Sequence, residues 1–216
     1  MRLIDLSQPL FDGCPNCPVH PPVSIEVTSS HAKNGPESWH MEQLSFASHT
    51  GSHVDAPLHK LQGGRAIDAF PLEIWSGPAL IVDLRGIAAN GQITATLLAE
   101  KLHPPTAIDG RWVLLATGFG DKRAKTKEWL HEPPVLAADG ARWLIEKNVR
   151  GVGIDHFSIG DAQTHAILLA KPVLIVEELH FPSDVFGITQ PLDFMALPIN
   201  LRGHSGAPCR PILVQR

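Results

Sequence analysis

Residues 151–177 read GVGIDHFSIGDAQTHAILLAKPVLIVE, which contains two apolar runs with a helical stretch between them. The runs cover residues 152–154 and 172–176, and the helical stretch covers residues 162–170. Short runs that are apolar throughout are typical of strands buried on both faces. Strand, helix and strand in alternation therefore predict an α/β fold.

The same alternation continues toward both ends of the chain. We expect Thr94 and Asp139 to be the N-caps of two further helices. Two period-two patterns, in residues 24–28 and 43–48, suit strands with one buried face. The other expected strands cover residues 3–7, 79–84, 112–116, 193–197 and 211–214, and the other helices cover residues 94–102 and 139–147.

The two terminal strands suggest antiparallel neighbours for a buried sheet, so a mixed sheet is expected. No internal repeat or break in composition divides the chain, and 216 residues are enough for one substantial core. The sequence therefore predicts one mixed-sheet α/β domain over residues 1–216.

Composition and charge exclude several classes of partner. The formal net charge is -4, with acidic and basic side chains interspersed, so no positive surface for nucleic acid is expected. No apolar run approaches the ~18 residues that span a bilayer. Three cysteines, Cys14, Cys17 and Cys209, are too few for a disulfide framework. We expect a cytoplasmic protein that acts on a small molecule.

Histidine is the unusual residue, because the chain has 12 histidines and no tyrosine. Residues 49–59 read HTGSHVDAPLH, and imidazole and carboxylate are ligands that zinc and manganese accept. On a helix, Asp55 would point about 200° away from His53. In an extended chain, side chains at odd-numbered positions project to one side. The segment therefore predicts an extended metal-binding strand with His49, His53, Asp55 and His59 on one side. Pro57 is expected to end that strand and turn the chain, so that His59 lies past the metal.

One strand supplies at most three ligands to one ion, so further ligands are expected from elsewhere in the fold. His165 lies in an otherwise apolar helical stretch, where an uncompensated imidazole is costly to bury. Glu177 and its neighbour Glu178 follow a buried strand, at the end where the sites of α/β sheets collect. Gly51 lies on the ligand side of the extended segment and leaves room for an ion.

The motif HTGSHVDAPLH resembles the signature of the cyclase and bacterial kynurenine formamidase family. The resemblance implies a swivelling, cyclase-like β/β/α-type fold and homodimers or homotetramers. It also implies Glu177 rather than Glu178 as a metal ligand, with Asp55 shared between two divalent ions. The implied ligand sets are His49, His53 and Asp55 for one ion, and Asp55, His165 and Glu177 for the other. The resemblance extends through residues 67–72, 79–84, 117–118, 151–158 and 206–210.

Family members hydrolyse amide bonds on aromatic nitrogen. The reactions are N-formylkynurenine to kynurenine and formate, a step of tryptophan catabolism, or opening of the lactam of isatin. The resemblance implies one or two Zn²⁺ or Mn²⁺ ions per subunit, which activate water and polarise the carbonyl. It also implies that His59 is the catalytic acid and base, which protonates the departing aryl amine.

Two places depart from the family pattern and concern the substrate. Many formamidases carry a tryptophan before a Pro-Gly turn in the N-terminal loop, where residues 14–20 here read CPNCPVH. Cys17 is therefore a candidate substrate contact. His156 is a second one, because relatives often have a small hydroxyl residue there. The charged run at residues 121–127 is expected to be a solvated loop.

Two rival hypotheses remain. A cyclase or lactonase would use the same ions on another carbonyl, and product analysis would separate it from an amide hydrolase. A non-catalytic binding protein would use the ions only to hold its fold. In that case, replacing His53 or Asp55 would abolish folding rather than activity alone.

Overall fold

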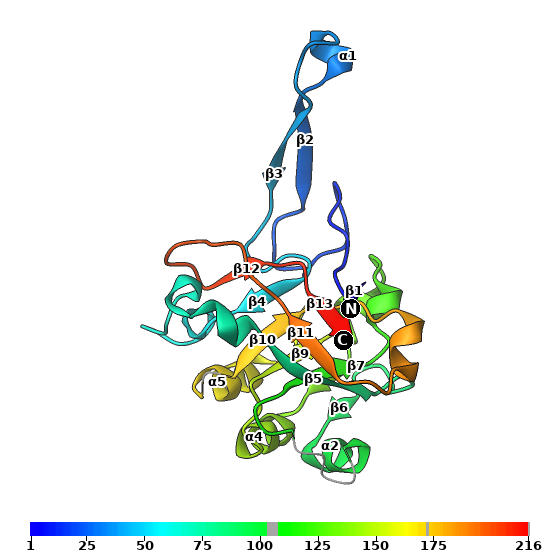
Figure 1. Cartoon of the computed structure of the whole chain (residues 1–216), viewed down its shortest axis with the longest axis vertical. Coiled ribbons are helices and arrows are strands. Elements are labelled where there is room, and N and C mark those ends of the chain that lie inside the picture. Colours follow the sequence, from blue (N-terminus) through cyan, green and yellow to red (C-terminus); the bar gives the residue numbers. More distant parts are fainter. Residues whose placement is uncertain (103–107, 172, 216) are drawn as a thin grey trace.

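The computed structural model describes residues 1–102, 108–171 and 173–215. A nine-stranded sheet runs through the body in the order β1-β13-β11-β5-β7-β9-β10-β4-β12 (Figure 1). Its strands are β1 (Arg2–Asp5), β4 (His53–Asp55), β5 (Ser76–Asp83), β7 (Trp112–Ala116), β9 (Gly151–Ile154), β10 (Leu174–Glu177), β11 (Leu192–Met195), β12 (Gly206–Pro208) and β13 (Ile212–Gln215). Two further pairs join β2 (Ser24–Ser29) to β3 (Met41–Ser45) and β6 (Gln92–Ile93) to β8 (Val135–Leu136).

The sheet is mixed, as predicted. The central strands β5, β7, β9 and β10 pair in parallel. β4 and β12 are antiparallel on one flank, and β11, β13 and β1 are antiparallel on the other. The residues of β7, β9 and β10 are all buried, which explains their continuous apolar sequence. Pro172, which began one predicted run, lies outside the described residues.

Three helices cover one face of the sheet (Figure 1): α2 (Ala95–Lys101), α4 (Ala138–Glu146) and α5 (Ala162–Leu169). Thr94 caps α2 as predicted, because its Oγ1 accepts a hydrogen bond from Leu97 N at 3.2 Å. The prediction that Asp139 is an N-cap is wrong. Helix α4 begins one residue earlier, and Asp139 Oδ2 instead accepts from Ala95 N at 3.2 Å. Its carboxylate therefore binds a backbone amide at the N-terminus of α2, where amides have no partner within the helix.

Two short helices, α1 (His31–Asn34) and α3 (Lys127–His131), lay outside the sequence predictions, as did strands β6, β8 and β12. Each contains few residues, so its periodicity was too weak to detect. No helix in the described part of the chain is long and apolar enough to cross a membrane.

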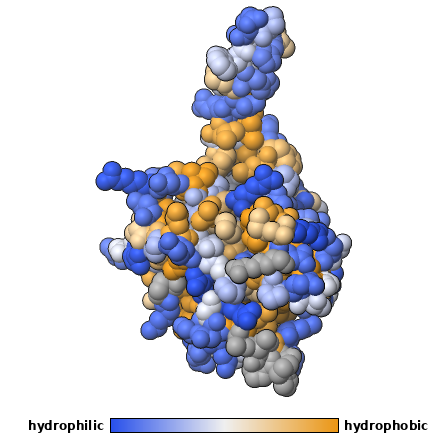
Figure 2. Space-filling model, in the orientation of Figure 1, coloured by the Kyte–Doolittle hydropathy of each residue, from blue (hydrophilic) through white to orange (hydrophobic). Residues whose placement is uncertain are grey.

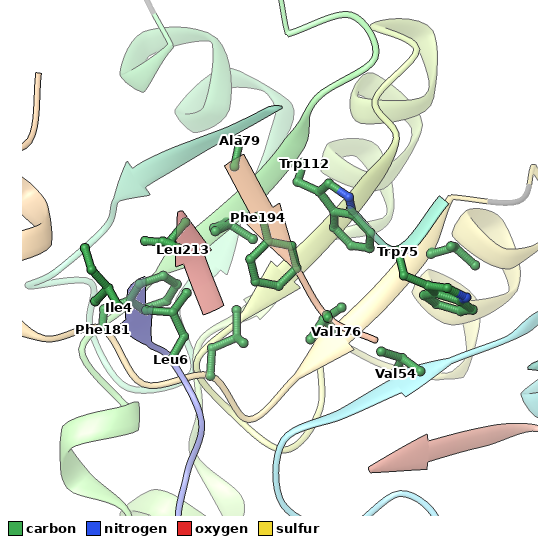
Figure 3. Close-up of a cluster of buried hydrophobic side chains, with 14 of the residues drawn as sticks. Ile4, Leu6, Val54, Trp75, Ala79, Trp112, Val176, Phe181, Phe194 and Leu213 are labelled. Carbon is green, nitrogen blue, oxygen red and sulfur yellow. The ribbon is translucent and has the colours of Figure 1, made fainter. Parts of the chain in front are cut away.

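The opposite face of the curled sheet encloses the larger aromatic side chains (Figure 3). Trp112 and Phe194 lie on strands β7 and β11, and their ring centroids are 5.1 Å apart. Trp75 is also almost fully buried. Burying each such side chain contributes roughly 1.5–3 kcal/mol to folding. This core fixes the central strands whose ends hold the candidate site.

β2 and β3 form an arm that projects from the body (Figure 1). The prediction that each strand has one buried face is wrong, because most arm residues are exposed on both faces. The apolar and polar residues do alternate, but no other element in the described part of the chain packs against either face of the arm. Figure 2 shows hydrophobic surface gathered where the arm meets the body.

Candidate metal centre

The histidine motif is only partly extended, which corrects the extended strand predicted from His49 onward but confirms that Pro57 ends it. Strand β4 contains His53–Asp55 alone, and a 3-10 turn, Pro57–His59, follows it. Before it, Gly51 adopts φ +66° and turns the chain. A Cβ at Gly51 would lie 2.7 Å from Leu10 Cδ2, so Leu10, not an ion, occupies that space. The turn folds His49 back toward the strand it precedes.

Strand pairing places the predicted ligands next to one another. β4 lies between β10 and β12, with His53 opposite Glu177 and Asp55 opposite Gly206. His53 and Asp55 share a face because they are two residues apart on a strand. Glu177 ends β10, as predicted for a site at the carboxyl end of a strand.

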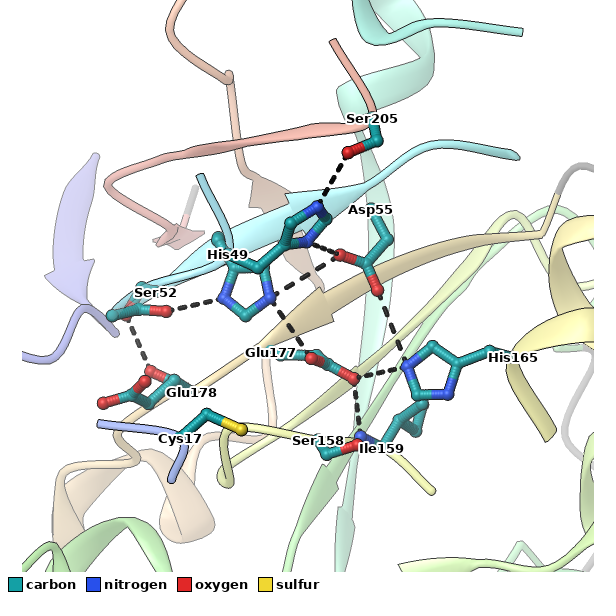
Figure 4. A network of polar contacts seen from close by, with 12 residues as sticks. Cys17, His49, Ser52, Asp55, Ser158, Ile159, His165, Glu177, Glu178 and Ser205 are labelled. Carbon is teal, nitrogen blue, oxygen red and sulfur yellow. Dashed lines mark hydrogen bonds and ion pairs between the residues drawn. The ribbon is translucent and has the colours of Figure 1, made fainter. Parts of the chain in front are cut away.

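The side chains meet around two buried carboxylates (Figure 4). Glu177 Oε2 is 3.2 Å from His53 Nε2, and Glu177 Oε1 is 3.2 Å from His165 Nε2. Asp55 Oδ1 is 2.7 Å from His49 Nδ1 and 3.5 Å from His53 Nε2. Asp55 Oδ2 is 3.7 Å from His165 Nε2. The structure thus brings together all five residues expected to be metal ligands.

His59 joins this cluster at its exposed edge. Its ring centroid is 3.9 Å from that of His49 and 5.8 Å from that of His165. Two compact sets of possible ligand atoms share Asp55: one with His49 and His59, the other with His53 and Glu177. The division into ions that the family resemblance implies is different, since it pairs His49 with His53, and that division stays a prediction.

Backbone carbonyls orient two of the imidazoles. His53 Nδ1 donates to Gly51 O at 2.7 Å, and His165 Nδ1 donates to Asp161 O at 2.9 Å. Carbonyl oxygens only accept, so the hydrogens lie on Nδ1. Both Nε2 atoms are then directed at Glu177, and each would offer its lone pair to a cation that displaces the Nε2 proton. Metal-binding histidines are usually held by such outer hydrogen bonds.

Two residues of the site escaped sequence reasoning. Ser205 Oγ lies 3.0 Å from His49 Nε2. A Cβ at Gly206 would come within 2.4 Å of His49 Cε1, so only glycine allows this approach. Residues 206–210, which resemble the family, were the only sequence signal for this region. They did not indicate that it packs against His49.

The electrostatics of the cluster fit a bound cation. Burial alone lowers the pKa of His53 and His165, but hydrogen bonds to Glu177 and the charges of both carboxylates raise each pKa to about 9. Without a metal ion, the protons on these two imidazoles balance the negative charge of Asp55 and Glu177. A bound cation would balance that charge in their place. Asp55 Oδ2 is buried and has no hydrogen-bond partner among the described residues. Imidazoles and carboxylates in this arrangement suit a divalent ion.

The two candidate substrate contacts differ in position. Cys17 is half-buried, and burial together with the charges of Glu177 and Glu178 raises the pKa of its thiol. His156 is fully buried, and its Nε2 donates to Trp129 O at 2.7 Å. Burial lowers the pKa of His156 to about 4, so the ring is neutral. Because it is buried, His156 can affect substrate binding only through the residues that contact it.

Residues 4–161 match the family model described as Putative cyclase. The chain belongs to the putative cyclase family. A relative named kynurenine formamidase, from Bacillus mycoides, is 29% identical across 97% of this chain and 96% of its own. Cyclase-like protein 3 of Oryza sativa subsp. japonica is 33% identical across 80% of this chain, which spans 65% of that relative's length.

Two solved structures share the fold. Isatin hydrolase A from Ralstonia solanacearum has a TM-score of 0.87 with 22% identity, and the match covers 100% of this chain and 92% of that one. A structure described as a potential metal-dependent hydrolase with cyclase activity has a TM-score of 0.80 with 30% identity, covering 100% and 98% of the two chains. The predicted cyclase-like mixed α/β fold is confirmed.

Proposed function

We propose that this member of the putative cyclase family is a metal-dependent hydrolase that cleaves an amide bond on an aryl nitrogen. This proposal rests on the convergence of three imidazoles on two buried carboxylates. Among the described residues, one oxygen of Asp55 accepts no hydrogen bond. The relative named kynurenine formamidase and the isatin hydrolase neighbour support an amide as substrate. The protein is a hydrolytic enzyme, and N-formylkynurenine or a cyclic aryl amide is its proposed substrate.

One or two divalent ions, Zn²⁺ or Mn²⁺, are the proposed cofactor. When bound, such an ion polarises a carbonyl and makes water a nucleophile near neutral pH. The residues proposed to hold it are His49, His53, Asp55, His165 and Glu177. Two of these imidazoles, His53 and His165, are kept in place because they donate hydrogen bonds to the backbone carbonyls of Gly51 and Asp161.

His59 is the proposed acid and base of the reaction. Burial lowers its pKa below the ordinary value of about 6.5 even though the charge of Asp55 opposes this. The ring is therefore neutral at pH 7 and can accept a proton from water. It can then deliver that proton to the departing aryl amine, as general acid–base catalysis requires. Its place beside His49, at the open side of the cluster, leaves it accessible to substrate.

Product analysis tests the reaction class. Purified protein loaded with zinc or manganese is incubated with N-formylkynurenine and with isatin, and release of kynurenine with formate, or of isatinate, is followed. We expect turnover of at least one amide. If the folded, metal-loaded protein instead hydrolyses only lactones or only closes rings, the cyclase or lactonase hypothesis replaces this one.

We also propose that the protein assembles as a homodimer through its β2–β3 arm. An isolated two-stranded ribbon is marginally stable in water, so the arm needs a surface to lie against. Its exposed apolar side chains supply a contact surface, because Trp39 is 79% exposed and Leu44 is 59% exposed. A second copy offers the same face, as two-fold assembly requires.

A further inference from the structure

Arg123 belongs to the charged run that was expected to be a solvated loop, and the structure buries it instead. Its side chain is 6% exposed, and its Nε lies 2.6 Å from Oε1 of Glu178, which is 1% exposed. A buried ion pair is a poor source of net stability, because both charges lose their hydration. Its position therefore calls for an explanation other than stability.

The remaining guanidinium nitrogens bind the N-terminal loop. Nη1 donates to Pro9 O at 2.7 Å, and Nη2 donates to Pro15 O at 3.1 Å. Nη2 also lies 3.7 Å from Cys14 Sγ. The rigid fork of one arginine thus connects two points of residues 9–23, called here the cover loop, to Glu178.

Local hydrogen bonds hold the next residues of the cover loop in a compact turn. Cys17 N donates to Asn16 Oδ1 at 2.8 Å, and His20 N donates to Cys17 O at 3.0 Å. Arg123 contacts both Pro15 O and the Glu178 carboxylate, so the loop passes beside the residue that follows Glu177, and Cys17 is two residues beyond Pro15. The charge of Glu177 also acts on the thiol of Cys17 and the imidazole of His20. Figure 4 shows Cys17 in the same view as Glu177 and Glu178. A shift at Pro15 would therefore move both side chains relative to the centre.

Glu178 is a fixed anchor for this contact. It directly follows Glu177 and adopts φ +56°, and its N donates to His156 O at 2.6 Å. Its own carbonyl accepts from Ser52 Oγ at 2.7 Å, and Ser52 directly precedes His53. The guanidinium of Arg123 thus joins the cover loop to the two strands that carry the metal ligands.

We propose that Arg123 is a positioning residue, which holds the cover loop so that Cys17 and His20 form one wall of the substrate site. The role in substrate binding rests on the proposed amide hydrolase function. The position of the loop does not, because it can be measured without turnover. The simpler role for Arg123 is to neutralise the Glu178 carboxylate, and the two roles predict different behaviour of a double variant.

The test uses Arg123→Met, which removes every donor, and Arg123→Met/Glu178→Gln, which also removes the charge that Arg123 would otherwise leave unpaired. Lys125→Gln is the matched control, since it loses one exposed positive charge from the same run. The readouts are the alkylation rate of Cys17, followed by mass spectrometry of its peptide, bound metal, and the kcat and KM for the amide substrate.

We expect both Arg123 variants to alkylate at Cys17 at least fivefold faster and to show about tenfold higher KM with kcat within threefold of wild type. Bound metal should stay unchanged, and Lys125→Gln should match wild type. If Arg123→Met does not fold, the double variant decides. Wild-type alkylation and KM in the folded double variant would overturn the proposal and leave charge neutralisation as the role. If no amide is turned over by wild type, the proposed function fails, while alkylation still tests the loop.

Discussion

His53 and Glu177 are directly opposite each other in the ladder of β4 and β10, and their side chains meet with Nε2 3.2 Å from Oε2. The candidate centre is therefore a product of strand register. A shift of one residue would turn Glu177 to the other face of the sheet and separate it from His53. The contacts of His165 with the same carboxylate would be lost as well.

Replacing Glu177 should remove metal without unfolding the protein. Glu177→Gln preserves the volume but takes away the charge that both His53 and His165 face. We expect metal affinity to fall by more than the roughly 10–100-fold typical of losing an outer-shell partner. Metal content by mass spectrometry and circular dichroism measure this, with exposed Glu100→Gln as the control. Full metal content in Glu177→Gln would remove it from the ligand set.

Gly206 should be intolerant of even a methyl group. A Cβ there would lie 2.4 Å from His49 Cε1 and 2.5 Å from Val54 O, so Gly206→Ala must displace the imidazole or the strand. We expect about tenfold weaker metal binding and a similar loss of kcat/KM. Gly187→Ala serves as control, because its Cβ would meet nothing within 4 Å. Equal metal affinity in the two variants would show that His49 is not held as described.

The metal-free protein should lose stability as the pH rises. The pKa values of His53 and His165 are raised to about 9, so the stability they contribute is fully present below about 6.5 and is lost as the pH rises through 9. Thermal unfolding at pH 6.5, 8 and 9.5 should show this decline with chelator present and a smaller one with metal bound, because bound imidazoles are already neutral. A flat profile in chelator argues against protonated histidines facing Glu177.

The arm should control assembly. Met41→Ser/Leu44→Ser removes two exposed apolar side chains from β3, and light scattering should show monomers where wild type forms dimers. Leu72→Ser is a matched control, because that leucine is 66% exposed on the body. A wild-type monomer, or a dimer that survives the double substitution, would refute the arm interface, and a tetramer would show a further contact.

Local pattern was sufficient for the buried parallel strands and for locating His49, His53 and Asp55, which gather at the candidate centre. Strands such as Trp112–Ala116 are apolar throughout because both faces are covered, and this leaves a clear signal. The extended conformation predicted for the residues before His53 was wrong because Gly51, at φ +66°, turns the chain. Glycine permits that turn but does not require it, so the sequence alone left both conformations open.

Contacts between distant segments could not be predicted in the same way. The exposed faces of β2 and β3 have the alternation of half-buried strands, and only the tertiary arrangement shows that they project from the body. Arg123 lies in a run of charges that reads as solvated, yet it is buried because Glu178 and two proline carbonyls surround it. Such burial depends on chain packing that one sequence does not reveal.

The most direct test of the central claim is to measure bound metal and amide turnover on the same samples during metal titration of chelated protein. The account predicts no turnover without metal, and turnover that returns in proportion to the zinc or manganese bound. His59→Ala should bind the same amount of metal but turn over roughly 10²–10⁴-fold more slowly. Undiminished turnover by protein shown to be metal-free, or by His59→Ala, would contradict the account.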